Sequence, residues 1–143
     1  MVYIGIDPGQ DGGISVIGEN ITESFVYSPE KLIEVLSHAR CAKVVLEKVG
    51  AMPKQGVAST FKFGQNYGYI MGVLEAFDIA YELVPPQKWK REFSCTSDKN
   101  KSIEVAHRLF PDVDLRATER CKKSHDGKAE SLLMAEYARR HMQ

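Results

Sequence analysis

The stretch that decides the fold is Tyr3–Gly13, YIGIDPGQDGG, an apolar run that ends on Asp7 and then turns on proline and glycine. Side chains alternate in a strand, so Asp7 lies on the opposite face from Ile4 and Ile6. The glycine-rich turn leads into Ile14–Ile17 and predicts a tight β-hairpin. We expect the small residues Gly5, Gly9 and Gly12 to leave open space around the carboxylate. An acid at the end of a buried strand needs a partner, which makes Asp7 a candidate site residue.

Length and composition describe one compact domain over residues 1–143. The chain is 43% hydrophobic, without a repeat or a low-complexity tract, and no apolar run reaches the ~20 residues that cross a bilayer. We therefore expect a cytoplasmic protein without a membrane partner. Cys41, Cys95 and Cys121 lack a paired metal spacing and are predicted to be free thiols.

Charge is balanced overall but unevenly distributed. Residues 1–47 hold 3 of the 19 basic and 7 of the 19 acidic side chains, so the two parts of the chain carry −4 and +4. This asymmetry permits a polyanionic partner without requiring one, because charged helices that face water have a similar composition.

The pattern along the rest of the chain predicts an α/β fold. A third strand is expected over 21–26 and a helix from Ser28-Pro29 to about Arg40, with an apolar stripe that includes Ile33. Lys43–Glu47 reads as a strand that also ends on an acid. Because a helix connects it to the hairpin, we expect it to lie parallel to and beside the first strand, which brings Asp7 and Glu47 to the same sheet edge.

The second half is predicted to be mainly helical. The loop 50–56 leads to a long helix over 57–77, in which Gly64, Gly68 and Gly72 share one face. Such glycines usually permit close backbone approach, so we expect close packing there, with a dimer surface as the alternative. Further elements are predicted as a strand over 79–84, a turn around Trp89, a helix capped by Ser97 or Asp98 that runs to Phe110, and a last helix from 124–126 to His141.

Asp126 and Glu130 are four residues apart on this last helix and therefore share a face, although two acids near a helix N-terminus are also favoured by the helix dipole. With Asp7 and Glu47 they form a set of four carboxylates that would repel one another without cations or protons. Oxygen ligands favour Mg²⁺ or Mn²⁺, and two such ions ~3.5–4 Å apart catalyse phosphodiester hydrolysis. We interpret the four acids as catalytic metal ligands of a nuclease.

Basic and aromatic side chains provide candidate nucleic-acid contacts. Aromatic rings near lysines can stack on bases, although rings at helical spacing more often belong to the core, and a basic loop can contact phosphates or simply face water. The candidates are Lys54, Phe61, Lys62, Phe63, Lys122, Lys123 and Lys128.

Five segments together resemble one enzyme family: GIDPG, LEK, FKFGQNYG, PPQKWK and HDGKAESLLMAEYARR. They look like the RuvC family of Holliday junction resolvases, especially its bacteriophage and prophage branch, over nearly the whole chain. The resemblance implies a ribonuclease H-like fold, with a five-stranded mixed sheet flanked by helices. It also implies a homodimer that resolves four-way DNA junctions with two Mg²⁺ ions per active site, with Mn²⁺ able to substitute. If a phage encodes the chain, its location is the cytoplasm of the bacterial host.

The resemblance assigns the metal ions to Asp7, Glu47, Asp126 and Glu130. The family pattern in the last helix is Asp-x-x-Asp, whereas this chain has Asp126-x-x-x-Glu130, so Asp126 is also interpretable as a helix cap. In the family an aromatic residue near the start of the long helix can wedge the junction open, and Phe61 or Phe63 is the nearest match.

Three other functions fit parts of the pattern. Sugar kinases and actin-like ATPases also begin with Gly-Ile-Asp-x-Gly, but their ATP site needs two such domains. A non-catalytic module that binds branched DNA would treat the acids as structural, and a ribonuclease H-type hydrolase of RNA–DNA hybrids would share the same fold. Activity on four-way junctions and on hybrids separates these functions.

Overall fold

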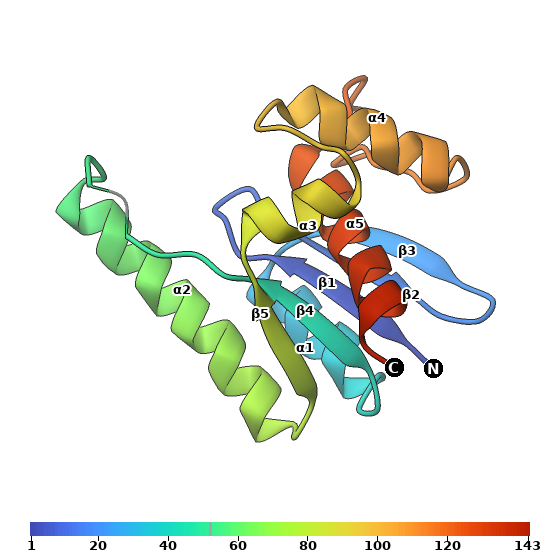
Figure 1. Cartoon of the computed structure of the whole chain (residues 1–143). Coiled ribbons are helices and arrows are strands. Elements are labelled where there is room, and N and C mark those ends of the chain that lie inside the picture. The colour runs from blue at the N-terminus through green and yellow to red at the C-terminus, as the bar shows by residue number, and fades with distance from the viewer. Residues whose placement is uncertain (52) are drawn as a thin grey trace.

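The computed structural model describes residues 1–51 and 53–143, so the position of Met52 in the predicted loop lies outside the described residues. Its centre is a five-stranded mixed sheet in the order β3-β2-β1-β4-β5 (Figure 1). The strands are β1 (Tyr3–Asp7), β2 (Gly13–Ile17), β3 (Thr22–Val26), β4 (Lys43–Glu47) and β5 (Ala80–Val84). β1, β2 and β3 pair antiparallel, whereas β4 pairs parallel with both β1 and β5. The predicted hairpin and the predicted neighbour of β1 are therefore both confirmed.

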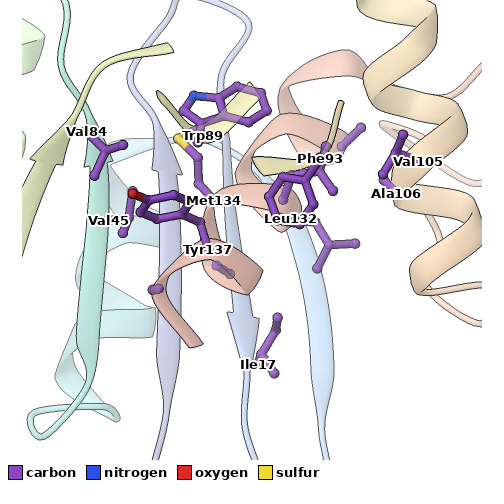
Figure 2. Close-up of a cluster of buried hydrophobic side chains, with 14 of the residues drawn as sticks. Ile17, Val45, Val84, Trp89, Phe93, Val105, Ala106, Leu132, Met134 and Tyr137 are labelled. Carbon is purple, nitrogen blue, oxygen red and sulfur yellow. The ribbon is translucent and has the colours of Figure 1, made fainter. Parts of the chain in front are cut away.

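Two hydrophobic clusters lie on opposite faces of this sheet. One face is covered by α1 (Pro29–Ser37) and by the second half of α2 (Val57–Ala76), whose Ile70 and Leu74 are fully buried. The other face packs against α5 (Asp126–His141), and α3 (Pro86–Glu92) and α4 (Lys99–Leu109) pack on α5 and add side chains to the same cluster. Figure 2 shows this second cluster, in which Met134 and Tyr137 of α5 lie over the sheet beside Trp89 of α3.

Alternation of side chains in β4 supplies both clusters from a single strand. Val44 and Leu46 enter the α1/α2 cluster, whereas Val45 enters the α5 cluster, and all three are fully buried. A central strand that is buried on both faces is the expected pattern where helices cover a partly parallel sheet.

Several helix boundaries follow from local capping. The Ser28 side chain accepts a hydrogen bond from the Lys31 N–H, with Pro29 at the first helical position, as predicted. α1 ends at Ser37, short of the expected Arg40, and Ile33 is 38% exposed, so it is not part of the core. Asp98, not Ser97, caps α4 by accepting from the Asn100 N–H.

The turn expected around Trp89 is instead the seven-residue helix α3. Pro85-Pro86 stops β5 and starts this helix, because proline suits the first helical turn, where an N–H would have no partner. The fully buried Trp89 anchors α3 in the α5 cluster.

The expected close packing at Gly64, Gly68 and Gly72 is wrong. A Cβ atom added at any of these three positions would meet no atom of another described element within 4 Å. The glycine side of α2 is thus open within the described part of the chain, and no residue from Val57 to Gln65 is buried.

Within residues 1–51 and 53–143, no helix combines the length and the hydropathy needed to cross a membrane.

Candidate active site

Two acids end adjacent parallel strands at one edge of the sheet. The register pairs Ile6 of β1 with Leu46 of β4, so Asp7 and Glu47 follow at equivalent positions, as the sequence predicts. Glu47 is only 8% exposed and Asp7 is half-buried. This is the carboxyl edge of the parallel strands, where open α/β sheets commonly place their sites.

A third acid reaches this edge from α5. Glu130 lies in the second turn of α5 and is 6% exposed. Burial, followed by repulsion from Glu47 and Glu130, raises the pKa of Asp7 to about 7. Burial and the Glu47 charge likewise raise the pKa of Glu130, and burial raises the pKa of Glu47. Asp7, Glu47 and Glu130 therefore lie within electrostatic reach of one another, and their mutual repulsion favours binding of protons or cations.

Asp126, the fourth predicted acid, has a different environment. It starts α5, its side chain is 30% exposed, and its Oδ2 accepts a hydrogen bond from Lys99 Nζ at 2.6 Å. Burial alone would raise the pKa of Asp126, but the Lys99 ammonium lowers it. The same ammonium also acts to lower the pKa values of Asp7, Glu47 and Glu130. Asp126 is thus already paired with a cation from α4.

Trp89 holds the Glu47 carboxylate in place. Its Nε1–H donates a hydrogen bond of 2.8 Å to Glu47 Oε2, and the indole is fully buried. The bond partly offsets the rise that burial causes in the pKa of Glu47. One carboxylate oxygen of Glu47 is therefore fixed from α3.

The glycine turn after β1 donates a backbone hydrogen bond to the Asp7 carboxylate. The Gly9 N–H donates to Asp7 Oδ1 at 3.0 Å, and the Gly12 N–H closes the turn on the Gly9 carbonyl at 3.1 Å. Among the three small residues expected to leave space for the carboxylate, only Gly9 borders it, since a Cβ there would lie 3.3 Å from Asp7 Oδ1. The expectation is wrong for Gly5, where a Cβ would meet the α5 backbone, and for Gly12, where it would meet the Asp7 carbonyl.

The donor chemistry of this edge fits a hard divalent cation. Carboxylate oxygens are the ligands that Mg²⁺ and Mn²⁺ prefer, and repulsion between these acids raises the pKa values of Asp7 and Glu130, so positive charge would stabilise the group. Within residues 1–51 and 53–143, however, no three His, Cys, Asp or Glu side chains are already arranged to coordinate a metal ion. Ion binding would therefore require these side chains to adjust.

Two of the three predicted nucleic-acid residues of α2, Lys62 and Phe63, lie beside this edge. A cleft of ≈ 490 Å³ separates the turn at Pro8, Gly9 and Gln10 from the first half of α2, and Lys62 and Phe63 belong to its lining. Phe63 is half-buried and stacks on Tyr67 with ring centroids 6.2 Å apart.

Phe61 of α2 and Lys54, which precedes α2, do not line this cleft. Phe61 is 69% exposed and Lys54 is also exposed. Their contact with DNA stays a prediction, as it does for Lys62 and Phe63.

The lysines of the basic segment 116–128, which runs into the first turn of α5, have two different environments. Lys122 and Lys123 are exposed, whereas Lys128 is 7% exposed and its Nζ donates to the Arg116 carbonyl at 2.6 Å. Burial lowers the pKa of Lys128. This geometry gives Lys128 a role in holding the preceding loop, and its predicted phosphate contact is untested.

Sequence reasoning overlooked Trp89 and Lys99 as site residues. Both contact predicted ligands across long sequence separations, 42 residues for Trp89–Glu47 and 27 for Lys99–Asp126. The PPQKWK segment signalled an unusual composition near Trp89, but no local pattern indicated which acid the indole meets.

The comparisons with known proteins bear on the fold. By sequence, no protein-family model and no curated protein matches the chain. By structure, the five-stranded mixed sheet with flanking helices is a ribonuclease H-like fold of the RuvC type. A structure of RuvC from Thermus thermophilus is 18% identical with a TM-score of 0.63, and covers 98% of this chain and 96% of its own. A structure of T. thermophilus RuvC in complex with a Holliday junction substrate is 19% identical with a TM-score of 0.65, and covers 99% and 96%. The predicted fold class is thus confirmed.

Proposed function

We propose that the chain is a metal-dependent endodeoxyribonuclease that nicks branched DNA, with four-way junctions as its preferred substrate. The observation that carries this proposal is that Asp7, Glu47 and Glu130, from β1, β4 and α5, lie within electrostatic reach of one another, and their repulsion contributes to a pKa of about 7 for Asp7. A site of this kind suits a cation and a phosphodiester together. The RuvC-type fold and the junction in one structural neighbour support the choice of substrate class.

In this proposal Asp7, Glu47 and Glu130 bind Mg²⁺ or Mn²⁺, and Asp126 joins them when its ion pair with Lys99 opens. Bound ions of this kind, two per site, supply activation of a water molecule and stabilisation of the leaving oxygen. The chain's own residues orient the ligands: Trp89 fixes one oxygen of Glu47, and the Gly9 N–H fixes one oxygen of Asp7.

The DNA strand is proposed to reach the acids along the first half of α2. Lys62 and Phe63 border the cleft next to the Asp7 turn, and the exposed Lys122 and Lys123 add positive charge on the loop before α5. Lysines bind phosphates largely by charge, so the binding should weaken steeply with salt.

We also propose that the active form is a homodimer, as two nicks in opposing strands would require. The open side of α2 supports this choice, because it exposes Val57 (89%), Phe61 (69%) and Tyr69 (41%) beside three glycines that no described element covers. Light scattering at micromolar concentration should give twice the mass of 16.0 kDa. A monomeric mass under conditions of full activity would contradict it.

The substrate is tested by incubating the protein with Mg²⁺ and equal concentrations of a labelled four-way junction, a linear DNA duplex and an RNA–DNA hybrid. We expect nicks in the junction at a rate at least ~10-fold above both others. Preferred cleavage of the hybrid would show a ribonuclease H-type hydrolase instead. Tight junction binding without any nicking would show a non-catalytic binding module.

A further inference from the structure

One side chain, Asn66, connects the long helix α2 to the turn that holds Asp7. Its Nδ2 donates a hydrogen bond to the Pro8 carbonyl at 3.2 Å, and its Oδ1 accepts a bond of 2.6 Å from the Tyr27 hydroxyl. The amide thus uses a donor and an acceptor at once, on partners 58 and 39 residues away in the sequence. Because both bonds depend on one planar group, they fix the orientation of the Asn66 side chain.

The connection continues to the carboxylate through the backbone. Pro8 directly precedes Gly9, whose N–H donates to Asp7 Oδ1 at 3.0 Å. The carbonyl that Asn66 binds and the N–H that Asp7 accepts belong to the same peptide group, which is planar. A rotation of this peptide would break both bonds together. The orientation of Asp7 is therefore coupled to the position of Asn66.

The second partner, Tyr27, is itself anchored to the same turn. Its backbone N–H donates to the Gly12 carbonyl at 3.0 Å, while the Gly12 N–H bonds to the Gly9 carbonyl. Asn66, Tyr27 and the turn consequently form a closed loop of hydrogen bonds that involves three separate segments of the chain.

The packing of α2 makes this bridge important for its first half. No residue from Val57 to Gln65 is buried, and the buried anchors Ile70 and Leu74 belong to the second half. Asn66 lies at the boundary between the two halves and next to the cleft that Lys62 and Phe63 line. A ligand that moves the first half of α2 would thus act on Asn66 before it acts on the core.

We propose that Asn66 is a positioning residue that transmits contact of DNA with α2 to the orientation of Asp7. This inference rests on the proposed function for its substrate, DNA, but the hydrogen-bonded bridge exists without metal or substrate. Contact along Lys62 and Phe63 strengthens the bridge, and the bridge holds the Pro8–Gly9 peptide with its N–H on the carboxylate.

The test uses Asn66→Ala and Tyr27→Phe, with Gln65→Ala as the matched control on the adjacent, exposed position of α2. The first readout is amide hydrogen exchange of the segment 8–13 in the full chain without metal. We expect exchange at least ~5-fold faster in Asn66→Ala than in wild type and unchanged exchange in Gln65→Ala. Adding a metal-free four-way junction should slow this exchange in wild type and in Gln65→Ala but not in Asn66→Ala.

The second readout separates binding from catalysis. We expect Asn66→Ala to bind the junction within ~3-fold of wild type and to nick it ~10–100-fold more slowly under single-turnover conditions, the range typical of residues that orient metal ligands. Tyr27→Phe should have a smaller effect in the same direction. Combined with Asn66→Ala it should add little, because both changes break one bridge.

Two outcomes would overturn the inference. Unchanged exchange of segment 8–13 in Asn66→Ala would show that the bridge does not hold the turn. Faster exchange across the whole sheet, with a matching loss of unfolding free energy, would show a purely structural bond. If no substrate is nicked by wild type while exchange follows the expected pattern, the proposed function fails and the link between Asn66 and the turn stands.

Discussion

At the scale of single residues, the site combines acids that could be predicted from the sequence with hydrogen-bond and ion-pair partners that could not. Asp7 and Glu47 were predictable because each ends an apolar run, and strand alternation with a crossover helix brings such ends together. Lys99 and Trp89 were not, because an ion pair and an indole hydrogen bond depend on how α4 and α3 pack over α5 and the sheet. Helical spacing predicted that Glu130 shares a face of the last helix with Asp126. Its proximity to the charge of Glu47 depends on how α5 packs on the sheet, which the spacing alone does not determine.

The fluorescence of Trp89 can report ion binding at Glu47, because Trp89 is the only tryptophan in the chain. Its Nε1–H is bonded to Glu47, so an ion that binds Glu47 changes the charge beside the indole. We expect Mg²⁺ to change the tryptophan emission of wild type with a saturating titration curve. The emission of Glu47→Gln should be unresponsive over the same range, and an equal response in that variant would place the ion elsewhere.

Trp89→Phe tests the same contact by removing the donor while keeping a large aromatic ring. The loss of the hydrogen bond leaves a buried Glu47 oxygen without its partner, which disfavours the charged form. We expect the Mg²⁺ concentration for half-maximal nicking to rise ~10-fold or more, the usual effect of losing a partner that orients a metal ligand. A variant with normal metal dependence would show that the bond serves stability alone.

Glu136, which lies outside the candidate site, forms ion pairs that should make the stability of the protein depend on pH. It is 3% exposed and accepts hydrogen bonds from Arg139 Nε at 2.7 Å and Arg140 Nε at 2.9 Å. Burial would raise the pKa of Glu136, but the two guanidinium groups lower it below its ordinary value of 4.5. Because the pKa of Glu136 is lower in the folded protein than in the unfolded chain, the ionised side chain stabilises the fold at pH values above 4.5. This stabilisation is lost as the pH falls through the pKa of the folded protein.

We therefore expect Glu136→Gln to reduce the free energy of unfolding by about 1–2 kcal/mol at pH 7, the range for hydrogen bonds to a charged group with partly exposed partners. The difference from wild type should shrink at pH 3, measured by urea unfolding at both pH values. Glu82→Gln, at an exposed position of β5, is the control that should stay within about 0.5 kcal/mol. A difference that is independent of pH would contradict the assigned ion pairs.

At the scale of elements, two kinds of glycine have opposite roles. A Cβ at Gly5 of β1 would overlap the α5 backbone at Ser131 and Ala135, so this glycine allows the helix that carries Glu130 to lie against the central strand. The glycines of α2, by contrast, have open space around them. Periodicity predicted both elements, but it could not show whether a glycine faces a neighbour or solvent.

This contrast gives a paired test by urea unfolding. Gly5→Ala should lower the free energy of unfolding by about 1–3 kcal/mol or more, because the added methyl group overpacks a backbone contact. At a concentration where the protein is monomeric, Gly68→Ala, in the exposed part of α2, should raise it by about 0.5–1 kcal/mol, because alanine favours the helix. Destabilisation of the monomer by Gly68→Ala would contradict the open space around this glycine.

At the scale of the whole molecule, the hairpin and the parallel neighbour of β1 followed from the sequence pattern, whereas the flanking of the sheet by helices was implied by the family resemblance. The positions of β3 and β5 in the sheet were not predicted. The hairpin turn and the alternation in β4 pointed to a mixed sheet, and Ser28 marked the start of the helix α1 that connects them. The side of α2 that faces solvent did not follow, because a helix with one buried half carries a similar residue pattern to a helix packed along its whole length. The structural likeness to RuvC at 18–19% identity confirms the fold, while the active-site chemistry depends on the acids themselves.

The central claim is that Asp7 belongs to a metal-dependent nuclease site, and single-turnover nicking of a synthetic four-way junction at increasing Mg²⁺ concentration tests it most directly. The variants are Asp7→Asn and the matched control Asp11→Asn, which changes an exposed acid four residues further along the same turn. We predict Mg²⁺-dependent nicking by wild type and Asp11→Asn. Asp7→Asn should nick at least ~1000-fold more slowly and still bind the junction, because it loses a ligand and one repulsive charge. Nicking by Asp7→Asn at the wild-type rate would contradict the account.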